Sequence, residues 1–358
     1  MDHRGRQSHL QVLLATSHLD GLLLTHLPNI RYLCGFTGSA GVLALTEKSK
    51  TFFTDSRYTI QAREEVQGAR VVAGRKNPLI AAGEWLKSHH RGLRLGIEGE
   101  HLSVAAQARL KAALSSKFRL KLAPPLVERA RMVKDDEELK RMRAAALLGV
   151  SLLAPLQKAL RPGARECEVA AEIEHAASQG GAEAMSFPTI IASGQRSALP
   201  HGRASRQAIP PGFVVCDFGV ILDGYCSDMT RTLSVGRAGE VPRRAYEAVR
   251  EAQQAAVDCV RAGRSVGEVD QAARKSLQKQ KLARYFTHST GHGVGLEIHE
   301  APRLAANGTD ILCSGMVVTI EPGVYLPGQF GIRIEDTVVV TERGCEVLTP
   351  ASKELIEL

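Results

Sequence analysis

Four acidic residues occupy equivalent places in two similar stretches of the chain. In each stretch a glycine opens a largely β-branched run that ends in a carboxylate, Asp217 in the first and Glu321 in the second. A second carboxylate follows, Asp228 or Glu335, two residues before a threonine. If the stretches fold alike around one centre, these four groups raise one another's pKa values and cannot all be ionised and unpaired. Two divalent cations would neutralise them, and oxygen ligands suit such ions.

Three histidines lie close together between the two halves of this pattern. His288, His292 and His299 fall within twelve residues, interrupted by Gly291, Gly293 and Gly295. Glycine lets the backbone approach a ligand closely. Histidine beside carboxylates commonly ligates metal or transfers protons. An imidazole ligand would extend the range of suitable ions from Mn²⁺ and Mg²⁺ to Co²⁺, Fe²⁺ and Zn²⁺.

Each acid also has an ordinary structural explanation. Asp217 precedes Phe218-Gly219 and could belong to a turn, and Asp228 could lie in an exposed hairpin. Glu321 could end a strand, and Glu335 could pair with an arginine across strands. The repeated order of the acids and the nearby histidines favour one shared site.

The elements that must position these residues carry a repeat of their own. The pattern Arg-x-Gly-x4-Glu-Val at residues 161–169 recurs at residues 261–269. With the repeated acids, it predicts a duplicated half-domain with an internal pseudo-two-fold. Two copies do not make a periodic array.

The first third of the chain predicts a separate α/β domain. Apolar runs at 19–25, 41–45 and 51–54 indicate strands, and residues 79–89 and 103–114 have helical periodicity. Pro124-Pro125 is a natural boundary, because neither residue continues a helix or a central strand. We therefore expect domains at 1–125 and 126–358. A charged helix should open the second domain after Asp135 and run to Pro162-Gly163.

At these motifs the chain resembles the pita-bread metallopeptidases, which include methionine aminopeptidases, Xaa-Pro aminopeptidases and Xaa-Pro dipeptidases (prolidases). The resemblance implies an α+β pita-bread catalytic domain behind a creatinase-type amino-terminal domain. Residues 29–39 and 54–58 resemble that amino-terminal domain, which methionine aminopeptidases lack. Creatinase shares the fold without the metal ligands, whereas every ligand position is filled here.

The resemblance also implies roles for individual residues. Asp217 would chelate one metal, His292 and Glu321 the other, and Asp228 and Glu335 would bridge them. Glu321 would also transfer a proton, and His299 would stabilise the tetrahedral intermediate. His201 and His288 would line substrate pockets, and Arg333 and Tyr325 would support the site or contact substrate. For Arg333 a purely structural ion pair is an equal alternative.

Bulk composition excludes other classes of protein. The net charge of +8 is spread along helical segments and aromatic residues make up 4%, which does not indicate a nucleic-acid surface. No stretch is apolar enough to span a membrane, and the first residues do not resemble a signal peptide. The seven cysteines are scattered without a C-x-x-C pair, as in a cytoplasmic protein with reduced thiols.

We therefore expect a cytoplasmic Xaa-Pro aminopeptidase that uses two divalent metal ions, Mn²⁺ first with Co²⁺ or Zn²⁺ as alternatives. Its substrates would be short peptides with proline in second position, and the family resemblance suggests a homodimer. The proline preference rests on the resemblance alone. An Xaa-Pro dipeptidase and a non-catalytic metal-binding protein on the same fold are the alternatives.

Overall fold

The computed structural model describes all 358 residues. The chain forms two compact units, Met1–Arg131 and Met132–Leu358. From the sequence we expected a boundary after residue 125. The residues that follow it belong to helix α6, Leu126–Met132.

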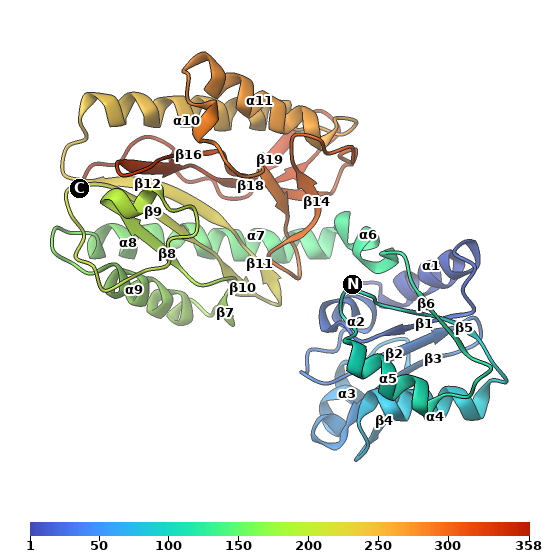
Figure 1. Ribbon diagram of the computed structural model, residues 1–358. Coiled ribbons are helices and arrows are strands. Elements are labelled where there is room, and N and C mark those ends of the chain that lie inside the picture. The colour runs from blue at the N-terminus through green and yellow to red at the C-terminus, as the bar shows by residue number, and fades with distance from the viewer. The chain divides into compact units, whose positions relative to one another are not determined.

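The amino-terminal unit is a mixed six-stranded sheet with helices on both faces (Figure 1). The strand order is β4-β3-β2-β1-β5-β6, with β1–β2 and β2–β3 antiparallel and the other pairs parallel. The strands are β1 Gly21–Leu24, β2 Val42–Thr46, β3 Lys50–Asp55, β4 Arg70–Gly74, β5 Arg94–Ile97 and β6 Arg119–Leu122. The helices are α1 His3–Thr16, α2 Leu27–Cys34, α3 Thr59–Glu65, α4 Pro78–His89 and α5 Val104–Ala113, with a short 3-10 turn at Ser56–Tyr58.

Helices α4 and α5 begin where the sequence indicates. Asn77 precedes Pro78 at the first turn of α4 and accepts a hydrogen bond from the amide of Leu79. Ser103 caps α5 by accepting from the amide of Ala106. Both helices contribute to an apolar core against the sheet, with Leu86 and Leu110 fully buried.

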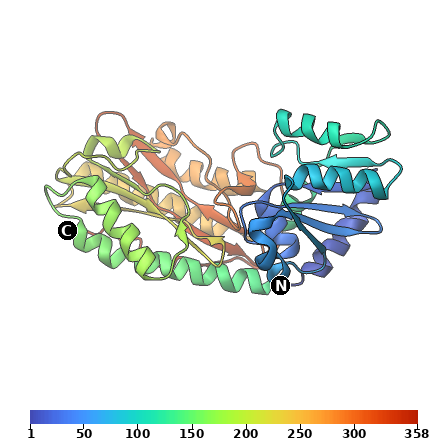
Figure 2. The same ribbon diagram turned by 90° about the horizontal axis from the view of Figure 1, so that it is seen from below.

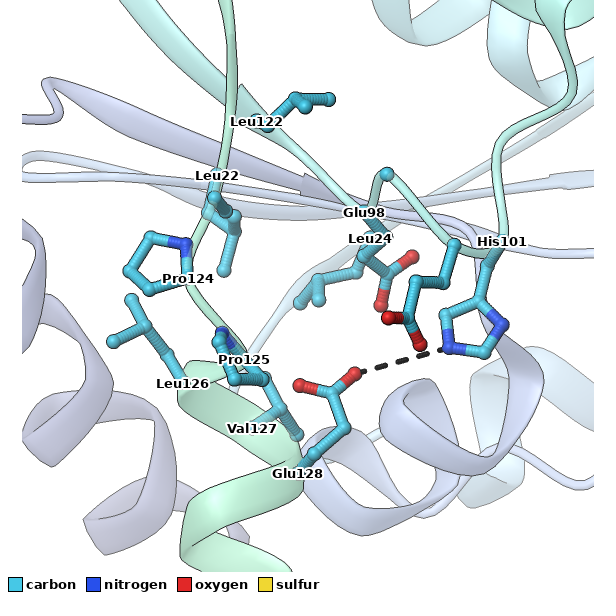
Figure 3. A pocket seen from close by; sticks show the side chains of 13 residues that line it. Leu22, Leu24, Glu98, His101, Leu122, Pro124, Pro125, Leu126, Val127 and Glu128 are labelled. Atoms are coloured by element: carbon cyan, nitrogen blue, oxygen red, sulfur yellow. Dashed lines mark ion pairs between the residues drawn. The ribbon is translucent and has the colours of Figure 1, made fainter.

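A pocket of about 400 Å³ lies within this unit (Figure 3). Aliphatic side chains such as Leu22 and Leu24 line one part, and Glu98, His101 and Glu128 line another. Glu98 accepts hydrogen bonds from the amides of Thr25 and His26, which holds its carboxylate at the start of α2. Glu98 therefore serves local structure.

The carboxyl-terminal unit places its strands between two layers of helices. Helices α8 and α9 pack against β8 and β9, and α10 and α11 pack against β14, β15 and β17 (Figures 1 and 2). The helices are α7 Asp136–Ser151, α8 Leu153–Ala159, α9 Glu166–Gln179, α10 Glu240–Cys259 and α11 Val266–Lys279, with 3-10 turns at Gly194–Ala198 and Ala283–Tyr285. None of the helices combines the length and apolar character needed to cross a bilayer.

The strands of this unit form four small sheets, with orders β12-β9-β8, β14-β13-β15-β18-β19, β11-β10-β7 and β16-β17. The first half supplies β7 Ala184–Met185, β8 Ile190–Ser193, β9 Gly212–Phe218, β10 Val220–Leu222, β11 Tyr225–Cys226 and β12 Met229–Val235. The second half supplies β13 Gly291–Gly293, β14 Glu300–Leu304, β15 Val317–Ile320, β16 Gly323–Leu326, β17 Phe330–Arg333, β18 Asp336–Val340 and β19 Cys345–Val347.

The two halves of the unit repeat one arrangement. Helices α9 and α11 begin one hundred residues apart, and Glu168 and Glu268 at their third positions accept from the amides of Arg165 and Ser265, the residues before each helix. Gly163 and Gly263 precede them with positive φ angles of 82° and 85°. The antiparallel pairs β9–β12 and β15–β18 follow in the same order. The predicted duplication, with its internal pseudo-two-fold, is therefore confirmed.

The charged helix expected from residue 135 to residue 162 is interrupted. Helix α7 ends at Ser151 and α8 begins at Leu153. Pro155 lies in the first turn of α8, where it has no amide hydrogen for the carbonyl of Ser151 and its ring crowds that group. The expectation of one continuous helix was therefore wrong. Pro155 is the residue of the sequence that indicated the interruption.

Candidate metal centre

The four predicted carboxylates come from the ends of paired strands. Asp217 lies near the end of β9 and Asp228 directly precedes β12, its antiparallel partner. Glu321 follows β15, and Glu335 directly precedes β18, which pairs with β15. Each half thus brings two acids to one cavity of about 680 Å³.

Burial makes ionisation of these groups costly. Asp228 and Glu335 are 5% and 2% exposed. Burial, followed by the charges of the neighbouring acids, raises the pKa of both carboxyls well above the usual range. Burial also raises the pKa of Glu321 to about 8. The surface-turn and surface-pair explanations of Asp228 and Glu335 are excluded, because both side chains are buried.

His292 presents a neutral ring nitrogen to this cluster. Its Nδ1 lies 3.0 Å from the carbonyl of Gly293, which assigns the ring proton to Nδ1. Burial lowers the pKa of His292 to about 4, so the ring is neutral at pH 7. Its Nε2 lies 3.6 Å from Asp228 Oδ2 and 3.5 Å from Glu321 Oε1, too far for good hydrogen bonds. The lone pair of His292 Nε2 and the carboxylates of Asp228 and Glu321 therefore face one another, and a cation bound between them would stabilise this arrangement.

The remaining ligand atoms fit the same interpretation. Ligand atoms of Asp228, His292 and Glu335 lie within 4.8 Å of one another. Asp217 Oδ1 is buried without a hydrogen-bond partner, while its Oδ2 accepts from Arg333 at 2.5 Å. Thr230 donates to Glu335 Oε2 at 2.6 Å and orients that carboxylate. The oxygen-rich set with one imidazole suits divalent cations.

The glycines beside His292 are required by close packing. A Cβ atom on Gly291 would lie 1.9 Å from the carbonyl oxygen of Thr319, and one on Gly293 would lie 2.2 Å from that of Ala301. Strand β13 therefore passes between its neighbours only as Gly-His-Gly.

A hydrogen-bonded chain joins the predicted substrate residues to the acids. His288 Nε2 lies 2.9 Å from the hydroxyl of Tyr325, and that hydroxyl lies 2.6 Å from Arg333 Nη1. Arg333 continues the chain to Asp217 and also donates to the carbonyl of Pro200 at 3.0 Å. Burial raises the pKa of Tyr325 to about 12 and lowers that of His288 to about 4. Both groups are neutral at pH 7.

The cavity gathers every predicted site residue except Tyr325, which reaches it through His288 and Arg333. His201 and His299 both line it, and the ring of His299 stands edge-on to that of His292 at 4.4 Å. Burial lowers the pKa of His299. Arg203 and Arg303 also line the cavity and are exposed. We did not single them out from the sequence, although Arg203 lies only two residues after His201.

Both units match known protein families. Residues 140–342 match metallopeptidase family M24, and residues 6–133 match the creatinase/prolidase N-terminal domain. The chain belongs to metallopeptidase family M24. It is therefore a metal-dependent peptidase, as its resemblance to pita-bread metallopeptidases indicated.

Similar proteins include members with two related activities. A solved Xaa-Pro dipeptidase from Bacillus anthracis has a TM-score of 0.95 and 39% identity, covering 99% of this chain and 100% of that one. An Xaa-Pro dipeptidase of Pyrococcus horikoshii is 37% identical over 340 residues, 94% of this chain and 95% of the relative. A solved X-Pro aminopeptidase from Thermotoga maritima has a TM-score of 0.88 and 33% identity, covering 99% of this chain and 100% of that one.

Proposed function

We propose that this M24 peptidase is an Xaa-Pro dipeptidase whose cavity recognises the free carboxylate of the dipeptide. The observation that carries the proposal is the presence of Arg203 and Arg303 in the cavity that also holds the acidic cluster. Arg303 Nε lies 3.5 Å from Ser289 Oγ, beside His288. Arginine binds carboxylates through paired hydrogen bonds. A dipeptide places such a group one residue beyond the bond to be cleaved.

Proline in the second position is proposed from the relatives. The three similar proteins described above are named for Xaa-Pro or X-Pro substrates, and two of them are named dipeptidases. We first expected an aminopeptidase from the sequence. The two arginines now favour the dipeptidase, because an aminopeptidase has no need to bind a carboxylate at that distance.

The proposed reaction is hydrolysis of the peptide bond before proline. Asp217, Asp228, His292, Glu321 and Glu335 would hold two divalent cations, Mn²⁺ being the first to test. When bound, such ions polarise the scissile carbonyl and lower the pKa of the attacking water.

The chain's own residues perform the remaining work. Glu321 would accept a proton from the attacking water and pass it to the proline nitrogen as the bond breaks. His299 would donate a hydrogen bond to the carbonyl oxygen as negative charge develops there. His201 and His288 would contact the substrate on either side of the scissile bond, while Arg333 holds Asp217.

The experiment compares Ala-Pro, Ala-Pro amide and Ala-Pro-Ala as substrates of Mn²⁺-loaded protein. We expect Ala-Pro to be cleaved and the amide to have a KM at least roughly ten-fold higher, because hydrogen bonds to charged groups contribute about 1.5–3 kcal/mol. In the double variant Arg203→Met with Arg303→Met the two substrates should become nearly equal. Arg343→Met is the control, because Arg343 is exposed between β18 and β19, outside the cavity.

Equal cleavage of Ala-Pro and Ala-Pro-Ala would instead establish an aminopeptidase. The variant Glu335→Ala should abolish all three activities. Cleavage of none of the three peptides by metal-loaded protein would overturn the proline assignment.

A further inference from the structure

Two buried acids, each paired with a partly exposed arginine, lie outside the candidate metal centre, one in each half of the catalytic unit. Glu166 is the first residue of α9, and Asp270 lies in α11. Both side chains are fully buried. Their partners are Arg196 at 3.1 Å and Arg274 at 2.7 Å.

Glu166 holds both ends of a segment that reaches the cavity. Its Oε1 accepts from the amide and hydroxyl of Ser193, each at 2.8 Å. Its Oε2 accepts from the amide and hydroxyl of Ser205, at 3.0 and 2.6 Å. The segment between these serines carries His201 and Arg203, which line the cavity.

Arg196 strengthens this attachment from within the segment. Its Nε binds Glu166, and its Nη2 donates to the carbonyl of Arg203 at 2.6 Å. The Glu166 carboxylate therefore also fixes the backbone of Arg203, through the side chain of Arg196.

Asp270 performs the corresponding task in the second half. Its Oδ1 accepts from the amide and hydroxyl of Thr290, at 3.2 and 2.9 Å. Arg274, held by Asp270, donates to the carbonyls of Phe286 and His288, at 3.0 and 2.6 Å. The carbonyl of Thr290 in turn accepts from the amide of Glu321 at 2.8 Å.

We propose that Glu166 and Asp270 are positioning residues, each holding one substrate-facing segment of the cavity. Glu166 fixes residues 193–205 with His201 and Arg203, and Asp270 fixes residues 286–290 with His288. The part of this inference that concerns substrate binding rests on the proposed dipeptidase function.

The chemistry of the two pairs supports this assignment. Burying a charged group is costly, and a well-packed apolar pair would stabilise a helix–sheet contact at least as well. Here the carboxylate oxygens accept from the amides and hydroxyls of the cavity segments. Such bonds fix a segment before substrate arrives, so less ordering is required on binding.

The test replaces each acid by its isosteric amide, in Glu166→Gln and Asp270→Asn. The amide side chain lacks the negative charge, and its NH₂ group faces the amide and hydroxyl donors that the carboxylate had accepted from. The control is Glu168→Gln, because Glu168 lies on the same helix but contacts Arg165 at its exposed start, through the amide and through a 4.0 Å ion pair with the side chain. Ser205→Ala is a milder change that removes one donor to Glu166.

Hydrogen–deuterium exchange of the metal-loaded proteins measures how firmly each segment is held, and it needs no substrate. We expect Glu166→Gln to speed exchange at residues 193–205 by about ten-fold or more and to leave residues 286–290 unchanged. Asp270→Asn should give the reverse pattern, Ser205→Ala a smaller change at 193–205, and the control neither. If either variant sped exchange equally in both segments, or in neither segment, the proposal would be overturned.

Kinetics and metal binding then separate positioning from general structure. For Glu166→Gln we expect kcat/KM on Ala-Pro to fall by about 10- to 100-fold, mainly through KM, with Mn²⁺ affinity unchanged. A loosened segment with wild-type kcat/KM would overturn the link to substrate. If the wild-type protein does not cleave Ala-Pro, the proposed function fails, but the exchange pattern still decides whether the acids hold the segments.

Discussion

The hydroxyl of Tyr325 connects one of the cavity histidines to the acidic cluster. It lies within hydrogen-bond distance of both His288 and Arg333, and Arg333 in turn binds Asp217. The ring of Tyr325 is buried in β16, so the aromatic body and the hydroxyl have separable functions. This makes the hydroxyl a clean target for a single-atom change.

We expect Tyr325→Phe to lower kcat/KM by roughly ten-fold and the free energy of unfolding by about 1 kcal/mol, the usual net contribution of one hydrogen bond. Steady-state kinetics and urea unfolding measure the two effects. The matched control is Tyr246→Phe, whose hydroxyl donates to the carbonyl of Lys353 outside the cavity. It should lose similar stability and retain activity. Equal kinetics in both variants would contradict the connecting role of Tyr325.

Residue types predicted the acids and histidines of the site but not the residues that hold them. The acids were visible because the repeat places them in register within a few residues of recognisable motifs. Glu166 and Asp270 had no such signal, because their partners lie up to 39 residues away and meet them only in the fold. Arg203 and Arg303 were missed for the same reason, since their exposure to the cavity depends on tertiary structure.

At the scale of elements, strand β13 is the most tightly confined part of the site. Gly291 and Gly293 flank His292, and side chains at either position would collide with the backbone of neighbouring segments. The position of the His292 ring therefore depends on how closely β13 approaches β15.

We expect Gly291→Ala to weaken Mn²⁺ binding and to destabilise the catalytic unit by about 1–3 kcal/mol, because β13 must move away from Thr319. Calorimetric titration and thermal unfolding measure these effects. Gly344→Ala is the control, because a Cβ atom there meets nothing within 4 Å. Unchanged metal affinity in Gly291→Ala would contradict this account of the strand.

Sequence patterns located the helices better than they located the helix ends. The expected helices at 79–89 and 103–114 correspond to α4 and α5, where local capping residues set the start. The break between α7 and α8 was not predicted, because the charged residues after Asp135 indicate where a helix begins and do not show that Pro155 interrupts it. The strands of the second half are short, and their pairing was predictable only through the repeat.

For the molecule as a whole, the acidic cluster should set how stability depends on pH. In metal-free protein, burial raises the pKa of Glu321 from 4.5 to about 8, and burial with the neighbouring acids raises those of Asp228 and Glu335 well above their usual range. The folded state then holds protons that the unfolded state has released. The stabilisation is complete below pH 4.5 and is lost as pH rises through 8. His292 acts oppositely, but only between pH 6.5 and about 4.

We therefore expect metal-free protein to lose unfolding free energy between pH 6.5 and 8, by about 1.4 kcal/mol per pH unit for each extra proton held. Urea unfolding after chelation measures the slope. Saturating Mn²⁺ should remove the loss, because cations take the place of the protons. A metal-free protein that gains stability over this interval would show that the acids are ionised without metal.

The positions of the two buried acids, Glu166 and Asp270, can also be compared across the internal repeat of the catalytic unit. With the repeat aligned at an offset of one hundred residues, Glu166 falls opposite Val266 and Asp270 falls opposite Ala170. The two acids therefore stand at non-equivalent positions of the repeat, four residues apart along their helices. The segments that carry His201 and His288 are thus held by an acid of the preceding helix in both halves, but from different places on that helix. The support of each segment is common to the two halves, whereas the sequence position of the supporting acid is not.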